Sequence, residues 1–127
     1  MHKVSEQRSR NMSAIKSKNT KPELYYDYSG SGLASLTKRR LDHFGIEMSN
    51  KEEVSIIRFD HYWSKNDLII DYVKIDVEGH ELDVLKGFGK IINKVKLIQF
   101  EFGGCNIDTR TYFQDFWYFF SERKFKL

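Results

Sequence analysis

The chain has 127 residues, of which 40% are hydrophobic and 31% are charged, a composition typical of a soluble globular domain. Its single cysteine, Cys105, excludes an internal disulfide and a cysteine-rich zinc site, and suits a reducing compartment. No apolar run approaches the roughly 18 residues that span a bilayer, and the polar residues 1–10 contain no signal-peptide core, so we expect a cytoplasmic protein without membrane contact.

The net charge of +3 is concentrated at the N-terminus. Residues 1–24 contain six Lys or Arg and two Glu, a net charge of +4. Residues 25–127 contain fifteen Lys or Arg and sixteen Asp or Glu, a net charge of −1. The main body therefore has no electrostatic reason to bind nucleic acid, and we expect any DNA contact to be weak and confined to residues 1–24.

The N-terminal segment is too polar to form a core of its own. We therefore predict a domain boundary between Leu24 and Tyr25, which divides the chain into residues 1–24 and 25–127. Small residues at 29–32 predict a flexible loop. Apolar residues at helical spacing then predict a helix that ends near Gly45. They are Leu33, Leu36, Leu41 and Phe44.

Beyond residue 53 the pattern alternates between strands and helices. Short apolar runs predict three strands, at residues 54–59, 72–77 and 95–102. Apolar residues at helical spacing predict a helix over 80–94, which Gly87 and Gly89 should break or kink. An aromatic-rich helix is predicted over 111–124. Strands joined by helix-length connections imply an α/β fold, with a parallel sheet covered by helices.

Residues 71–81 carry the strongest chemical signal. They are predicted to run from a strand through a tight turn into a helix, and ligands of open α/β sheets lie at the carboxyl ends of strands. Asp76 lies at such an end, and the turn then supplies Glu78, Gly79, His80 and Glu81. The acidic groups could hold a cationic cofactor such as a sulfonium, or polarise a substrate hydroxyl. His80 could act as a general base, and Gly79 would let a ligand approach the backbone closely.

An alternative interpretation of this stretch needs no ligand. Acidic residues at a helix N-terminus stabilise the helix dipole and cap free N–H groups. A lone histidine is more often a surface residue than a catalyst. On composition alone, capping is the more frequent role for acidic residues in such a turn.

Residues 73–87 read Val-Lys-Ile-Asp-Val-Glu-Gly-His-Glu-Leu-Asp-Val-Leu-Lys-Gly, and this order resembles the hallmark of FkbM-type S-adenosylmethionine-dependent methyltransferases. The flanking sequence is similar too. Residues 30–36 resemble the family's Ser/Gly loop, and Phe59-Asp60 resembles its short Leu-Asp element. Residues 99–103 resemble its next strand, which ends in an acidic residue. The resemblance extends from about Tyr25 to the C-terminus.

This resemblance implies an incomplete class I (Rossmann-like) methyltransferase fold, a mostly parallel sheet with flanking helices. It also implies S-adenosylmethionine as the cofactor and a hydroxyl group of a sugar or other small molecule as the methyl acceptor. The implied catalytic residues are Asp76, Glu78, His80 and Glu81. The implied cofactor contacts are Asp60, Asp76 and Gly79, and the implied substrate contacts are Ser31, Ser35 and Glu101. No metal site is expected.

The sequence departs from the family pattern before Tyr25. The family's first strand and glycine-rich turn bind the methionyl part of the cofactor, and an acidic residue after its second strand binds the ribose; neither has a counterpart there. We therefore expect a truncated domain that is inactive alone and does not measurably bind S-adenosylmethionine. Missing strands would leave open sheet edges and exposed apolar surface, so self-association is expected as well.

Residues 4–24 instead resemble the start of the very-short-patch mismatch endonucleases, the Vsr family. There the segment helps to engage DNA, and Met12 would correspond to a methionine that wedges between bases. Basic residues beside an apolar wedge suit a distorted duplex. An ordinary solvated basic tail is the alternative. The family's catalytic aspartate and zinc ligands have no counterpart after Leu24, so the chain is interpreted as a junction between two unrelated gene pieces.

Three functions remain open from the sequence. The chain could be a methyltransferase fragment, a DNA-binding protein that acts through residues 1–24, or a module that completes a sheet supplied by another chain. The absent glycine turn argues against independent catalysis. The aromatic cluster in residues 112–120 could form a substrate platform, but such a stripe is more often helix core packed on a sheet.

Overall fold

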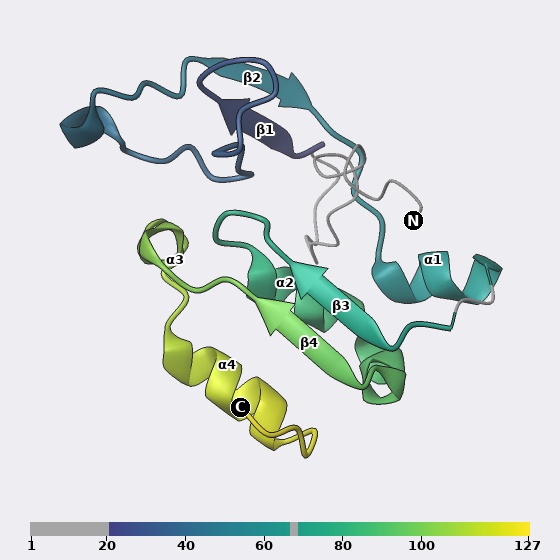
Figure 1. Ribbon diagram of the computed structural model, residues 1–127. Coiled ribbons are helices and arrows are strands. Elements are labelled where there is room, and N and C mark those ends of the chain that lie inside the picture. The colour runs from purple at the N-terminus through teal and green to yellow at the C-terminus, as the bar shows by residue number, and fades with distance from the viewer. Residues whose placement is uncertain (1–20, 67–68) are drawn as a thin grey trace.

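The computed structural model describes residues 21–66 and 69–127, which form two small sheets and several short helices (Figure 1). In Figure 1 the β1–β2 sheet lies above the β3–β4 sheet. In chain order the elements are β1 (Glu23–Tyr26), the 3-10 helix η1 (Asp42–Phe44), β2 (Asn50–Glu53), α1 (Phe59–Asn66), β3 (Tyr72–Ile75), α2 (Glu81–Gly87), the 3-10 helix η2 (Gly89–Lys94), β4 (Leu97–Phe100), α3 (Gly104–Asp108) and α4 (Phe113–Ser121).

Strands β1 and β2 form an antiparallel pair, in which Glu23 lies opposite Glu53. Tyr25 of β1 also pairs with Ser35 through two backbone hydrogen bonds of 2.8 and 3.0 Å. This bridge holds the chain around Ser35 extended beside β1. The buried apolar side chains of this part of the molecule are Leu24, Leu41 and Met48.

Strands β3 and β4 are parallel, with Tyr72 opposite Leu97, and α2 and η2 form the connection between them. This β-α-β unit confirms the predicted parallel pairing and brings the carboxyl ends of both strands to one edge. The predicted helix break is confirmed as well. Helix α2 ends at Gly87, and η2 begins at Gly89, whose φ of 55° lies in the left-handed region that glycine tolerates.

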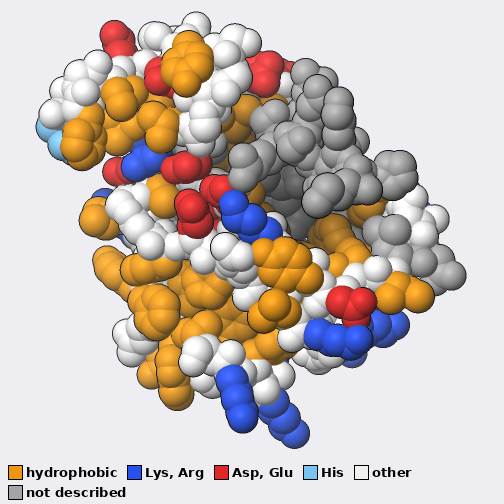
Figure 2. Space-filling view, viewed as in Figure 1, with side chains coloured by type: hydrophobic (Ala, Val, Ile, Leu, Met, Phe, Trp, Pro, Cys, Tyr) orange, Lys and Arg blue, Asp and Glu red, His pale blue; other side chains and the backbone are white. Residues whose placement is uncertain are grey.

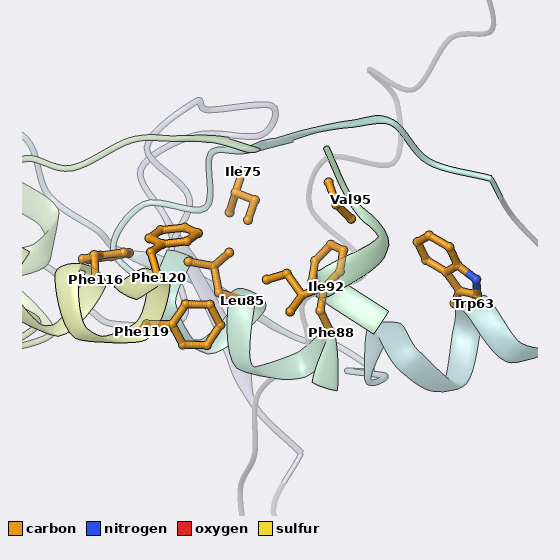
Figure 3. Packing of buried hydrophobic residues seen from close by; sticks show 9 residues of the cluster. All are labelled: Trp63, Ile75, Leu85, Phe88, Ile92, Val95, Phe116, Phe119 and Phe120. Atoms are coloured by element: carbon orange, nitrogen blue, oxygen red, sulfur yellow. The ribbon is translucent and has the colours of Figure 1, made fainter. Parts of the chain in front are cut away.

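The main core lies on one face of the β3–β4 sheet, against α1, α2, η2 and α4. It contains Trp63, Ile75, Leu85, Phe88, Ile92, Val95, Phe116, Phe119 and Phe120 (Figure 3). The ring of Phe100 stacks on Phe116 with centroids 4.6 Å apart, so the aromatic helix packs on the sheet as predicted. On the opposite face of the sheet, Tyr72 is 50% and Leu97 60% exposed. Figure 2 shows hydrophobic side chains gathered over α4 and β4.

Two predicted elements are wrong. The helix expected to end near Gly45 is absent, because the bridge to β1 holds the chain around Ser35 extended and only the short η1 forms before Gly45. The strand expected over residues 54–59 is also absent. The backbone N–H of Val54 donates to the carbonyl of Pro22 just beyond the last β1–β2 pair, and α1 begins at Phe59. Helices α1 and α3 were not predicted.

The described residues form two sheets of two strands each. Of the predicted, mostly parallel sheet, they contain β3 and β4. The predicted boundary after Leu24 falls within β1. Residues 4–20 of the Vsr-like segment, and with them Met12, lie outside the described residues. Within the described residues, no helix has the length and apolar character needed to cross a membrane.

Candidate functional site

The turn between β3 and α2 has a backbone shape that depends on its glycine. Glu78 and Gly79 both have positive φ, 53° and 102°. A Cβ atom at Gly79 would lie 2.7 Å from the Cys105 carbonyl oxygen and 2.9 Å from Cγ2 of Thr109. The absence of a Cβ atom at Gly79 therefore lets the turn pack closely against α3. The same absence would let a ligand approach the backbone of the turn.

Glu81, the first residue of α2, is fully buried and holds this turn in place. Its Oε1 accepts hydrogen bonds from the backbone N–H groups of Val77 and Gly79, each at 3.1 Å. Its Oε2 accepts a hydrogen bond of 3.2 Å from Nδ2 of Asn106. Glu81 therefore connects the turn to α3, and its described contacts are structural.

Three carboxylates gather at the carboxyl edge of the β3–β4 sheet. Oxygens of Asp76, Glu78 and Glu101 lie within 4.8 Å of one another, although 25 residues separate Asp76 from Glu101 in sequence. Burial raises the pKa of Glu78 above its ordinary value; the Arg39 guanidinium opposes that shift, and the charges of Asp76, Glu101 and Glu81 add to it. Such a cluster could hold a cation, either a sulfonium or a metal ion.

Residues 35–39, which begin at the bridge to β1 and bend at Leu36 and Thr37, clamp the turn from the side of the β1–β2 sheet. Ser35 Oγ donates to the carbonyl of Glu78 at 2.8 Å. Thr37 Oγ1 lies 2.9 Å from Nε2 of His80. Arg39 donates to Glu78 Oε2 at 3.1 Å and to Asp108 Oδ2 at 3.0 Å, and its side chain is only 11% exposed. Ser35, Thr37 and Arg39 thus all contact the turn.

Sequence reasoning missed most of this clamp. Ser35 was expected in the site, whereas Thr37, Arg39 and Asp108 were not. No local signal marks Thr37 or Arg39, because their partners lie at least 39 residues away in sequence. The prediction placed both residues in a helix instead.

Both ring nitrogens of His80 are occupied. Nδ1 lies 2.9 Å from Oδ2 of Asp83, one turn along α2, and Nε2 faces Thr37. His80 is the N-cap residue of α2, yet its side chain makes no capping hydrogen bond. The side chains of the turn are therefore engaged mainly in contacts other than simple helix capping.

Two predicted site residues have partners outside the carboxylate cluster. Ser31 Oγ accepts a hydrogen bond of 3.1 Å from the backbone N–H of Leu33 within its own loop. Asp60 pairs with Arg58 at 2.6 Å and lies close to Gly89, just beyond the C-terminal end of α2. Because α2 leads back from the carboxyl ends of the strands, this places Asp60 toward the opposite edge of the sheet.

The chain matches the family described as the Methyltransferase FkbM domain over residues 5–127. No curated protein and no solved structure gives a match. The match includes residues 5–24, and nothing in the comparisons supports a Vsr-like N-terminal segment. The family implies a Rossmann-like fold, to which the parallel β3–α2–β4 unit corresponds. Since the matched residues make up almost the whole sequence, the chain belongs to the FkbM methyltransferase family.

Proposed function

We propose that this domain serves S-adenosylmethionine-dependent methyl transfer to a hydroxyl group of a sugar or other small molecule. The observation that carries the proposal is the group of three carboxylates from Asp76, Glu78 and Glu101, at the edge of a parallel sheet where ligands of such folds lie. Membership of the FkbM family supports the reaction class. When bound, the cofactor would supply an electrophilic methyl group on a positively charged sulfur.

The chemistry of the cluster suits such a group. Carboxylates of Asp76 and Glu78 are partly shielded from solvent, where they interact with a cation more strongly than in water. Glu101 is exposed and would face an incoming substrate. Residues Ser35 and Glu81 shape the turn through Glu78 and Gly79, and we assign them positioning roles in this proposal.

We further propose that the 127-residue chain does not carry out the reaction unaided. In its described part the parallel sheet has two strands, and Tyr72 and Leu97 on one of its faces are 50% and 60% exposed. Parallel sheets of this fold class are normally covered on both faces. Additional strands and helices, supplied within a larger protein or by another chain, would therefore be needed to form the cofactor pocket. Completion of a sheet with another chain is a second function, which the edges of the two-stranded β3–β4 sheet in the described residues favour.

Substitution of Asp76 by Asn tests the proposed reaction. In a version whose sheet has been completed with the family's cofactor-binding strands, D76N should abolish methyl transfer to a hydroxyl acceptor, because an amide cannot supply the carboxylate charge. Asn caps a helix about as well as Asp, so loss of capping would not explain such a result. Activity within a few-fold of the parent would refute the catalytic role.

Asp71→Asn is the matched control. Asp71 lies just before the other end of β3, and its carboxylate pairs with Lys96 at 2.6 Å, with both side chains largely exposed. The same change of charge at that position should leave methyl transfer unaffected. Calorimetric titration of the 127-residue chain with S-adenosylmethionine should show no binding, whereas micromolar affinity would contradict the need for additional strands.

A further inference from the structure

His80 lies between a hydroxyl group and a carboxylate. Thr37 Oγ1 is 2.9 Å from Nε2, and Asp83 Oδ2 is 2.9 Å from Nδ1. The imidazole is largely buried, with 17% of the side chain exposed, whereas Asp83 is 45% exposed. Contacts from two different segments therefore fix the plane of the ring.

We propose that Asp83 is a positioning residue that holds neutral His80 in the Nδ1-protonated tautomer, so that Nε2 is the proton acceptor for a hydroxyl group. An ionised carboxylate can only accept hydrogen bonds, so Nδ1 must carry the proton in this contact. A neutral imidazole has one N–H, and Nε2 is consequently left with a lone pair. The Thr37 hydroxyl can donate to that lone pair, and a substrate hydroxyl would reach Nε2 by displacing it.

This inference rests on the proposed function for the identity of the acceptor. In the transfer step, the substrate oxygen forms a bond to the methyl carbon, and the carbon–sulfur bond breaks with its electron pair going to sulfur. The hydroxyl proton goes to Nε2 of His80. The resulting imidazolium keeps its hydrogen bond to Asp83 and later returns the proton to solvent, so charge and atoms balance.

The tautomer can be measured without any methyl donor. Solid-state NMR of the full chain labelled with 15N in its histidine rings distinguishes protonated from unprotonated ring nitrogens, and it tolerates self-association. At a pH where the imidazoles are neutral, His80 should show a protonated Nδ1 and an unprotonated Nε2. Exposed His43 and His61 serve as internal references, and the signal lost in H80Q assigns His80.

Asp83→Ala should change the Nδ1-H to Nε2-H ratio of His80 at least tenfold toward Nε2-H. Asp115→Ala is the matched control, because Asp115 occupies the same third position in α4 and bonds to the Tyr112 backbone N–H instead. D115A should leave the ratio unchanged, and T37V should change it less than twofold. A His80 protonated on Nε2 in the parent, or an unchanged ratio in D83A with its helical circular dichroism retained, would overturn the proposal.

The outcome also separates this inference from the proposed function. A fixed Nδ1-protonated tautomer with no methyl transfer in the completed domain would leave the role of Asp83 intact and refute the reaction. Methyl transfer that is lost in D76N but retained in D83A and H80Q would support the reaction and refute the role of the imidazole as proton acceptor.

Discussion

Glu81→Ala should destabilise the fold more than any other single change of charge in the turn. The substitution leaves three donors without their acceptor: the backbone N–H groups of Val77 and Gly79, and Nδ2 of Asn106. An unsatisfied buried polar group costs about 1–3 kcal/mol. Relief of the desolvation of a buried carboxylate offsets part of this loss. We therefore expect a net loss of about 3 kcal/mol, a large share of the roughly 5–15 kcal/mol that stabilises a domain.

Thermal and urea unfolding measure this effect. A loss of about 3 kcal/mol should lower the Tm by roughly 10 °C in a chain of this size. Glu81→Gln should lie between parent and E81A, because its amide oxygen keeps the two backbone bonds while its NH2 group faces the donor of Asn106. The Asn106 side chain cannot simply rotate, since its Oδ1 already accepts from Gly103 at 2.8 Å.

Glu47→Ala, at an exposed position, is the control and should change stability by less than about 0.5 kcal/mol. Should E81A unfold within about 2 °C of the parent, the buried hydrogen bonds of Glu81 would contribute little, and Glu81 would not be the residue that holds the turn in place.

Three further changes can be tested together. Glu78→Gln should flatten the pH dependence of stability, because burial raises the folded-state pKa of Glu78. The parent therefore loses stability as the pH rises from the ordinary pKa of a glutamate through the raised pKa. Urea midpoints that shift equally with pH in both proteins would contradict this. Light scattering at micromolar concentration should show association, because Leu97, Phe113 and Trp117 expose 60%, 47% and 52% of their surface, whereas a clean 15.1 kDa monomer would exclude it. Residues 1–24 should give DNA binding that is weak, falls steeply with salt and lacks cleavage; nicking that disappears on their deletion would refute this.

The β-α-β unit was predictable because its signals are local. Strand residues 72–75 alternate on the sheet and precede a turn with glycine, and Gly87 and Gly89 mark the interruption of the following helix. The aromatic helix was predictable for the same reason, since Phe116, Phe119 and Phe120 follow the helical period and are buried. The acidic residues of the turn were chosen as site candidates from the sequence because they follow a strand.

The clamp was not predictable, because distant partners determine its conformation. Residues 33–44 have apolar residues at helical spacing, but the pairing of Ser35 with Tyr25 outweighs that local preference, and Phe44 remains 70% exposed. Strand β2 consists of Asn50 to Glu53, a polar run with no apolar alternation, so its pairing with β1 leaves no local signal. The role expected for Asp60 came from a two-residue resemblance, and no described contact connects Asp60 to the carboxylate cluster.

The clamp between residues 35–39 and the turn has a consequence for the order of folding. Its contacts from Ser35 to Glu78 and from Thr37 to His80 each span 43 residues, and that from Arg39 to Asp108 spans 69. Contacts of such sequence separation form slowly, because the intervening chain must be closed into a loop first. The clamp contacts both the carbonyl and the carboxylate of Glu78, whose backbone is left-handed. In refolding, helical circular dichroism should therefore recover first, and the arrangement of the carboxylates should mature last.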